Sequence, residues 1–219
     1  MKKTTNLALA LAIFAFIITG CASGKNIAFD HTPTPLEGVW RNAREKYSDT
    51  VYTFTGNKWQ FNSATSKPGS GMFVLKKDEI IFYKENGKKW GLNATRKYRV
   101  SDVAFRLEWQ NVNAGFVKQP VEEFVTSGEM LSRFEGTWVS TSTQFPYKYT
   151  FSGNKFAHKV NLAVEGTFEL NSRIIKLKFP KGIIWFEYEF KDNDLSLNII
   201  AGDYDTSDYR FAYGNFKKQ

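Results

Sequence analysis

One pattern of eight residues occurs twice in this chain of 219 residues, and it limits the folds that the chain can adopt. Residues 52–59 read Tyr-Thr-Phe-Thr-Gly-Asn-Lys-Trp, and residues 149–156 read Tyr-Thr-Phe-Ser-Gly-Asn-Lys-Phe. In both copies two alternating arms flank a Gly-Asn pair, which tolerates the positive φ angles of a tight hairpin turn. Each copy therefore predicts a β-hairpin, and the two-residue loop places Phe54 opposite Trp59 in the first one.

The similarity between the two halves of the chain extends beyond this hairpin. Residues 36–40 (Leu-Glu-Gly-Val-Trp) match residues 134–138 (Phe-Glu-Gly-Thr-Trp), and both motifs precede the Gly-Asn hairpin. Two further hairpins with alternating apolar residues follow in each half, and the similar segments 115–119 and 215–219 close the halves. Each half is therefore read as one strand, three hairpins and one strand, or about eight strands.

Short strands with regular turn signals are typical of sandwiches and barrels. Because consecutive hairpins favour an up-and-down meander, and because closure removes exposed edges, we expect each half to close on itself. The predicted fold is all-β, with two tandem short up-and-down antiparallel meander β-barrels at residues 36–119 and 134–219. Residues 120–133 are expected to form a linker, in which Pro120 and the acidic residues after it open a short helix.

The first residues are typical of an export signal. Lys2 and Lys3 precede an apolar run at residues 7–18, which is too short to span a membrane comfortably as a permanent helix. The sequence Ile-Thr-Gly then leads to Cys21, the single cysteine of the chain, so no disulfide can form within it. Residues 1–20 are therefore predicted to be a signal peptide.

The residues before Cys21 resemble the lipobox of bacterial lipoproteins, in which an apolar residue and two small residues precede the modified cysteine. The resemblance implies that Cys21 is acylated, becomes the mature N-terminus and anchors the protein in a membrane of the cell envelope. Ala22 follows in place of aspartate, which in enteric bacteria implies sorting to the outer membrane. Residues 21–35 are expected to be a flexible tether. An ordinary secretory signal is the alternative.

The Gly-x-Trp motif opens each predicted barrel, with Gly38 and Trp40 in the first half and Gly136 and Trp138 in the second. This motif on the first strand of an eight-stranded meander resembles the lipocalin or calycin family. The resemblance implies an up-and-down barrel that binds an apolar ligand. It also implies that each tryptophan packs across the closed end of its barrel, against a basic residue of the last strand.

The basic residues on the predicted last strands are Lys118 and Lys218. Residues 207–209 (Ser-Asp-Tyr) resemble the second family motif, Thr-Asp-Tyr, which the first half lacks. Each half spans about 85 residues, fewer than family members usually have, and the usual arginine of the last strand is missing.

An eight-stranded barrel is just wide enough to be filled by side chains or to hold one small ligand. The inward positions predicted for the first half are mainly large aromatic residues, which would fill a shallow interior. The second half has smaller leucines, and a histidine replaces Phe61 there, either as a ligand contact or as a satisfied core or rim residue. The residues predicted to bind a ligand are Tyr149, His158, Phe168, Leu177 and Tyr188.

No catalytic constellation is evident in the sequence, so we expect a protein that is not an enzyme and needs no metal or cofactor. His31 and His158 lack a nearby nucleophile signature, and no Cys/His cluster has the spacing of a zinc site. Asp203, Asp205 and Asp208 gather near a predicted turn but lack the glycine and glutamate of an EF-hand calcium loop.

The formal net charge of +8 becomes +6 when Lys2 and Lys3 are removed with the signal peptide. The densest basic group, from Lys76 to Arg99, alternates with apolar residues or lies in turns, and we interpret it as a solvated outer face. The aromatic residues fall on faces that the barrels must bury, which argues against nucleic-acid binding.

Two functions from different classes remain open. The first is a lipid-anchored envelope protein that binds a small apolar ligand inside a barrel without catalysis. The second is an anchored protein with solid barrels whose surface contacts an envelope or host macromolecule, with the basic group from Lys76 to Arg99 as the contact face. The first is favoured, because it follows from the resemblance to lipocalins.

Overall fold

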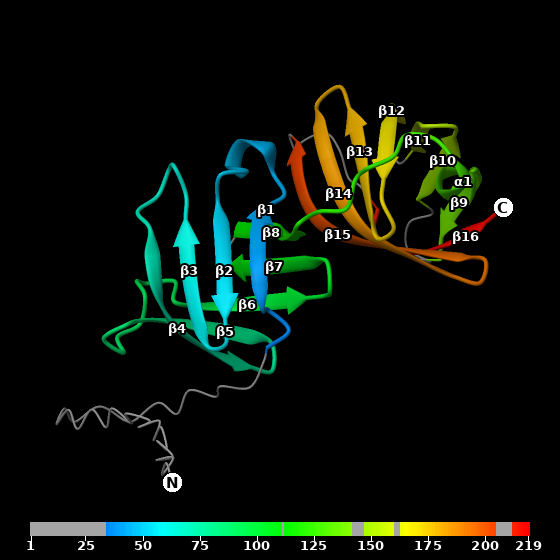
Figure 1. The fold of residues 1–219 in the computed structure, drawn as a ribbon. Helices are drawn as coiled ribbons and strands as arrows, with labels where there is room; N and C mark the ends of the chain where they lie inside the picture. Colours follow the sequence, from blue (N-terminus) through cyan, green and yellow to red (C-terminus); the bar gives the residue numbers. More distant parts are fainter. Residues whose placement is uncertain (1–33, 111, 142–146, 160–162, 205–211) are drawn as a thin grey trace, which may run out of the picture.

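Two closed antiparallel β-barrels follow one another along the chain (Figure 1). The computed structural model describes residues 34–110, 112–141, 147–159, 163–204 and 212–219. Each barrel has eight strands that pair with their neighbours in sequence, and the first strand of each barrel also pairs with the last. The predicted all-β fold with two tandem up-and-down meander barrels is confirmed.

The first barrel consists of β1 (Gly38–Asn42), the short 3-10 helix η1 (Glu45–Tyr47), β2 (Val51–Thr55), β3 (Lys58–Asn62), β4 (Gly69–Lys76), β5 (Glu79–Lys84), β6 (Thr95–Val100), β7 (Ala104–Trp109) and β8 (Val112–Gln119). The second consists of β9 (Gly136–Ser140), β10 (Lys148–Ser152), β11 (Lys155–Lys159), β12 (Ala163–Leu170), β13 (Ile174–Phe179), β14 (Gly182–Lys191), β15 (Asp194–Tyr204) and β16 (Gly214–Lys218). The helix α1 (Glu129–Ser132) lies between them in sequence.

The Gly-Asn hairpins have the register that the turn length predicts. In the first barrel Phe54 pairs with Trp59 and Tyr52 pairs with Phe61, and the second barrel repeats this register. The turn residue Gly56 has a φ of 57°, in the left-handed region that glycine adopts without steric cost.

The motif Leu-Glu-Gly-Val-Trp at residues 36–40 makes contacts that close one end of the first barrel. Trp40 Nε1 donates a hydrogen bond of 2.6 Å to the carbonyl oxygen of Leu36, and the N–H of Gly56 donates one of 2.9 Å to Glu37 Oε2. Lys118 Nζ, from the last strand, lies 5.4 Å from the centre of the Trp40 ring. These contacts join the first strand, the first hairpin and the last strand at the closed end.

The second barrel repeats all of these contacts. Trp138 Nε1 donates to the carbonyl oxygen of Phe134 over 2.6 Å, and the N–H of Gly153 donates to Glu135 Oε1 over 2.6 Å. Lys218 Nζ lies 5.5 Å from the Trp138 ring. The structure therefore contains, in both barrels, the tryptophan–cation contact that the resemblance implies.

The motif requires glycine at its third position for two reasons. Gly38 has a φ of 123°, which L side chains rarely adopt, and a Cβ there would lie 3.1 Å from Lys118 Cε. Gly136 has a φ of 103°, and a Cβ there would lie 3.2 Å from Lys218 Cε. The lysine stem crosses the glycine on its way to the indole ring.

Buried side chains fill most of both barrels. The core of the first consists of Leu36, Trp40, Tyr52, Phe54, Trp59, Phe73, Ile80, Phe82, Phe105, Leu107 and Phe116. The core of the second includes Phe134, Trp138, Tyr149, Phe151, Phe156, Phe168, Leu170, Ile175, Leu177, Ile184, Phe186, Tyr188, Leu195, Leu197 and Phe216. The period-two alternation of the sequence thus places the predicted aromatic residues inside the barrels.

The two barrels also pack directly against each other. Residues of both form a third apolar cluster, which includes Ala104, Val117, Ile174 and Ile200. A Cβ at Gly115 would lie only 1.9 Å from the backbone oxygen of Ile200, so the backbones of β8 and β15 approach too closely for a side chain there.

Residues 120–133 contain a short helix, but it does not open at Pro120 as expected. In the described residues the α-helix of this region is α1, which begins nine positions later at Glu129. Val125 instead exchanges two backbone hydrogen bonds, of 2.7 and 3.1 Å, with Leu170 of β12. These contacts with the second barrel outweigh the local helix signal of proline and acidic residues.

Candidate functional site

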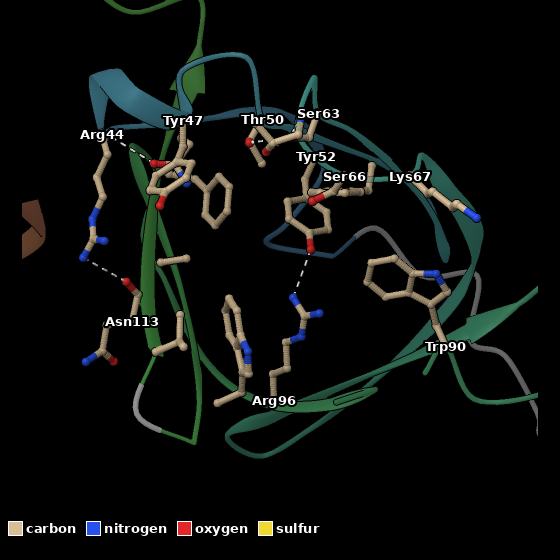
Figure 2. Close-up of a pocket in the computed structure, with 17 residues that line it drawn as sticks. Arg44, Tyr47, Thr50, Tyr52, Ser63, Ser66, Lys67, Trp90, Arg96 and Asn113 are labelled. Atoms are coloured by element: carbon tan, nitrogen blue, oxygen red, sulfur yellow. Dashed lines mark hydrogen bonds between the residues drawn. The ribbon is translucent and has the colours of Figure 1, made fainter. Parts of the chain in front are cut away.

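A cavity of about 380 Å³ opens at one end of the first barrel (Figure 2). It lies at the start of β2 and the end of β3, which is the end opposite to the Gly-Asn turn. The loops after β1, β3 and β5 and the β7–β8 hairpin complete its wall. Small-molecule sites in proteins occupy roughly 300–1,000 Å³, so the cavity suits a small ligand.

The wall of the cavity is mainly apolar and aromatic. Phe61 and Trp90 face each other with ring centres 5.8 Å apart, and Trp109 and Phe116 also contribute. Hydroxyl and amide side chains stand among them, as the labelled Thr50, Ser63, Ser66 and Asn113 in Figure 2 show. Apolar walls with a few polar groups are the usual composition of a ligand pocket.

Arg96 of β6 lies inside the cavity, with only 9% of its surface exposed. Its Nη1 donates a hydrogen bond of 3.0 Å to the hydroxyl of Tyr52, and its Nε donates one of 3.0 Å to the carbonyl oxygen of Asn93. Figure 2 shows Arg96 and Tyr52 reaching toward each other across the cavity. The guanidinium carbon also lies 4.4 Å from the Trp109 ring centre and 5.5 Å from that of Trp90.

The electrostatic balance of the cavity is positive. Arg44 and Lys67 line it together with Arg96, and no aspartate or glutamate does. None of the ion pairs in the described part of the chain includes Arg96. Arg44 Nε is buried without a hydrogen-bond partner. The cavity therefore holds buried positive charge that no carboxylate of its wall neutralises.

Tyr52 is protonated at neutral pH. Burial raises the pKa of its hydroxyl above the ordinary value, and the opposing effect of the neighbouring Arg96 charge is smaller. The hydroxyl oxygen accepts a hydrogen bond from Arg96 and keeps its own proton to donate.

The second barrel has no arginine at the equivalent place. Arg96 pairs with Ile80 across β5 and β6, and Phe186 pairs with Ile175 across β13 and β14. The repeat therefore aligns Arg96 with Phe186, which is fully buried in the second core. Closing a barrel of this type does not require a charge at this position.

The five residues predicted to bind a ligand lie in the core of the second barrel, and each is at most 5% exposed. His158 stacks on Tyr149 with ring centres 4.2 Å apart, and its Nδ1 lies 3.1 Å from the backbone oxygen of Lys148. Tyr188 donates a hydrogen bond of 2.6 Å to the backbone oxygen of Asn171, and burial raises its pKa to about 12. The ligand-binding role of these residues stays a prediction.

The basic group from Lys76 to Arg99, interpreted as a solvated outer face, includes Arg96, and this interpretation is wrong for Arg96, which is buried. The signal that identifies it is the alternation of β6, because Arg96, Tyr98 and Val100 share one face of the strand. Tyr98 and Val100 pack against the first core, so the same period places Arg96 inside, whereas Lys97 and Arg99 are exposed.

Several predictions fall on residues outside the described ranges. They concern Cys21, His31, the Ser-Asp-Tyr motif at residues 207–209, Asp205 and Asp208. In the parts of the chain that are described, no helix is long and apolar enough to cross a membrane. In the same parts, no cluster of three His, Cys, Asp or Glu side chains is placed to hold a metal ion.

Comparisons with family models, curated proteins and solved structures found no match to this chain. The likeness to lipocalins therefore rests on the chain itself. Its two closed eight-stranded antiparallel barrels fit a lipocalin-like barrel fold.

Proposed function

We propose that the protein binds a small, largely apolar ligand in the open end of the first barrel, without changing it chemically. The observation that carries this proposal is the cavity of about 380 Å³ with aromatic walls inside a lipocalin-like barrel. This cavity lies in the first barrel, whereas the smaller residues of the second half had favoured a site in the second barrel.

A cavity-filling variant tests this proposal. Ala114 of β8 lines the cavity, and Ala114→Trp would occupy part of its volume. Gln60 of β3 is exposed, so Gln60→Trp adds the same side chain outside the barrel. The chain from Ala22 onward retains both complete barrels and is the form to titrate with 1-decanol by calorimetry.

We expect the unsubstituted chain and the Gln60→Trp variant to bind 1-decanol equally. The Ala114→Trp variant should bind about five- to 150-fold more weakly, because overpacking a filled site costs about 1–3 kcal/mol. Equal binding by all three chains would place the ligand elsewhere. No binding by the unsubstituted chain, tested also with an anionic amphiphile, would reject the proposal.

The anchoring part of the proposal rests on the sequence around Cys21. We propose that this cysteine is acylated and holds the barrels at a bacterial membrane, with the outer membrane as the expected site. Incorporation of labelled palmitate into the full chain, and its loss in Cys21→Ser, is the expected result. Equal labelling of the two chains would reject the anchor and leave the barrel proposal intact.

A further inference from the structure

We infer that the ligand of the first barrel is an anionic amphiphile, whose head group binds between Arg96 and Tyr52 while its apolar part lies against the aromatic wall. This inference rests on the proposed function and specifies the class of its ligand. The observation that separates it from general apolar binding is the buried guanidinium group inside the cavity.

Arg96 has more hydrogen-bond donors than the described residues have acceptors for them. A guanidinium group has five N–H donors, and in the structure Arg96 uses one on Tyr52 and one on the carbonyl oxygen of Asn93. The other three have no acceptor among the described residues. A buried charge is costly unless it is paired, and a planar donor group of this kind matches a carboxylate or a phosphate.

The aromatic contacts of Arg96 do not replace a counter-ion. The rings of Trp109, Phe82 and Trp90 lie 4.4, 5.3 and 5.5 Å from its guanidinium carbon. Such cation–π contacts attract the cation, but their energy is smaller than the cost of removing a charge from water. They hold the guanidinium group in place and leave its charge available to an anion.

The second barrel closes without a charge at the position of Arg96. The second barrel has Phe186 where the first has Arg96, and it closes in the same way. Tyr149 of the second barrel aligns with Tyr52 but has a different partner. Its hydroxyl donates a hydrogen bond of 3.1 Å to the backbone oxygen of Ala212. In the first barrel, the Tyr52 proton has no such acceptor among the described residues and can be donated to a head group.

The remaining charges agree with an anionic head group. Arg44 and Lys67 line the same cavity, and its lining contains no carboxylate side chain. Electrostatic attraction to these cations would draw an anion toward the open end, and Arg96 would bind it inside, where the dielectric constant is lower.

The test compares probes that differ only in the head group. Decanoate and 1-decanol, below the concentrations at which they self-associate, are titrated into the chain from Ala22 onward by calorimetry, and acetate is the head group alone. We expect decanoate to bind at least about tenfold more tightly than 1-decanol, since a charge-assisted hydrogen bond is worth that ratio or more. Acetate should bind far more weakly than decanoate, because it lacks the apolar part.

Three variants connect the preference to the residues. Arg96→Met should abolish the preference for decanoate over 1-decanol, and Tyr52→Phe should reduce this preference in part. Lys97→Met is the matched control, because Lys97 is the exposed neighbour on the same strand, and it should behave like the unsubstituted chain. Circular dichroism verifies that each variant is folded.

The outcomes separate this inference from the proposed function. Equal binding of decanoate and 1-decanol would overturn the anionic head group and leave the apolar site intact. A preference for decanoate that survives Arg96→Met would overturn the role of Arg96. Failure of both probes would reject the proposed function itself, and acetate binding as tightly as decanoate would reject an amphiphile in favour of a free anion.

Discussion

Replacing Arg96 with methionine tests whether this arginine serves the fold or a ligand. The substitution removes two charged hydrogen bonds, to Tyr52 and to the carbonyl oxygen of Asn93, each worth about 1.5–3 kcal/mol, and cation–π contacts worth about 0.5–2 kcal/mol. It also removes the cost of burying the charge, which is several kcal/mol per ion, and it buries a methionine side chain worth about 1.5–3 kcal/mol. Because these losses and gains are of similar size, we expect the free energy of unfolding of the first barrel to change by less than about 2 kcal/mol in either direction.

Urea unfolding followed by tryptophan fluorescence measures this quantity. Four of the six tryptophans, Trp40, Trp59, Trp90 and Trp109, belong to the first barrel, so the signal reports mainly on its unfolding. Phe54→Ala provides the comparison, because this side chain is buried, is not one of the three rings around Arg96, and its loss should cost about 3–5 kcal/mol.

A loss of more than about 2 kcal/mol in Arg96→Met would refute the reasoning. It would mean that the contacts of Arg96 with Tyr52, Asn93 and the three rings stabilise the fold by more than the cost of burying the charge. The arginine would then be a structural part of the first barrel, and its incomplete hydrogen bonding would no longer indicate a ligand.

Two further predictions concern stability. Gly71→Ala should destabilise the first barrel by about 2 kcal/mol or more, because the new Cβ would lie 1.9 Å from the backbone oxygen of Tyr83. The control Ser70→Ala, on the exposed face of the same strand, should cost less than about 0.5 kcal/mol. Equal urea midpoints for the two variants would contradict this prediction. Tyr188 has a pKa raised to about 12, so its burial favours folding below pH 10 and this contribution is lost as the pH rises from about 10 to about 12. Stability measured over this range should fall less steeply in Tyr188→Phe than in the unsubstituted chain, and identical slopes would show that another group controls alkaline unfolding.

The barrel architecture and its register followed from local signals that the chain repeats. A two-residue Gly-Asn turn determines which residues pair across a hairpin, so Tyr52 could be placed opposite Phe61 from the sequence alone. Because the two halves are similar in sequence, the strand pattern of one half also predicts that of the other. The motif with Trp40 also predicted its partner Lys118, because the resemblance to lipocalins carried that contact.

The cavity was harder to predict, because its position depends on how side chains fill one end of a barrel. Residue size favoured the second barrel, yet the described cavity lies in the first, where Arg96 occupies the position of Phe186. Counting bulky residues does not predict this, because the guanidinium group of Arg96 needs hydrogen-bond partners and does not pack as closely as the phenyl ring of Phe186 does. The prediction of a helix opening at Pro120 was wrong because it considered only neighbouring residues. The backbone of Val125 pairs instead with Leu170, which is distant in sequence.

The repeat itself separates structural from functional residues. At the closed end the two barrels use the same contacts, with Glu37 and Glu135 each accepting a hydrogen bond from the glycine of its hairpin turn. At the other end they differ, because Phe61 corresponds to His158 and Arg96 to Phe186.

A duplicated domain needs its closing contacts in both copies, whereas residues that recognise a ligand are free to differ between copies. The differences at the open end are therefore where a function of this chain should be sought, and Arg96 is the difference whose burial and charge require a physical explanation. If introducing arginine in Phe186→Arg left the second barrel as stable as before, a buried charge at this position would carry no cost, and the contrast between the barrels would lose its meaning.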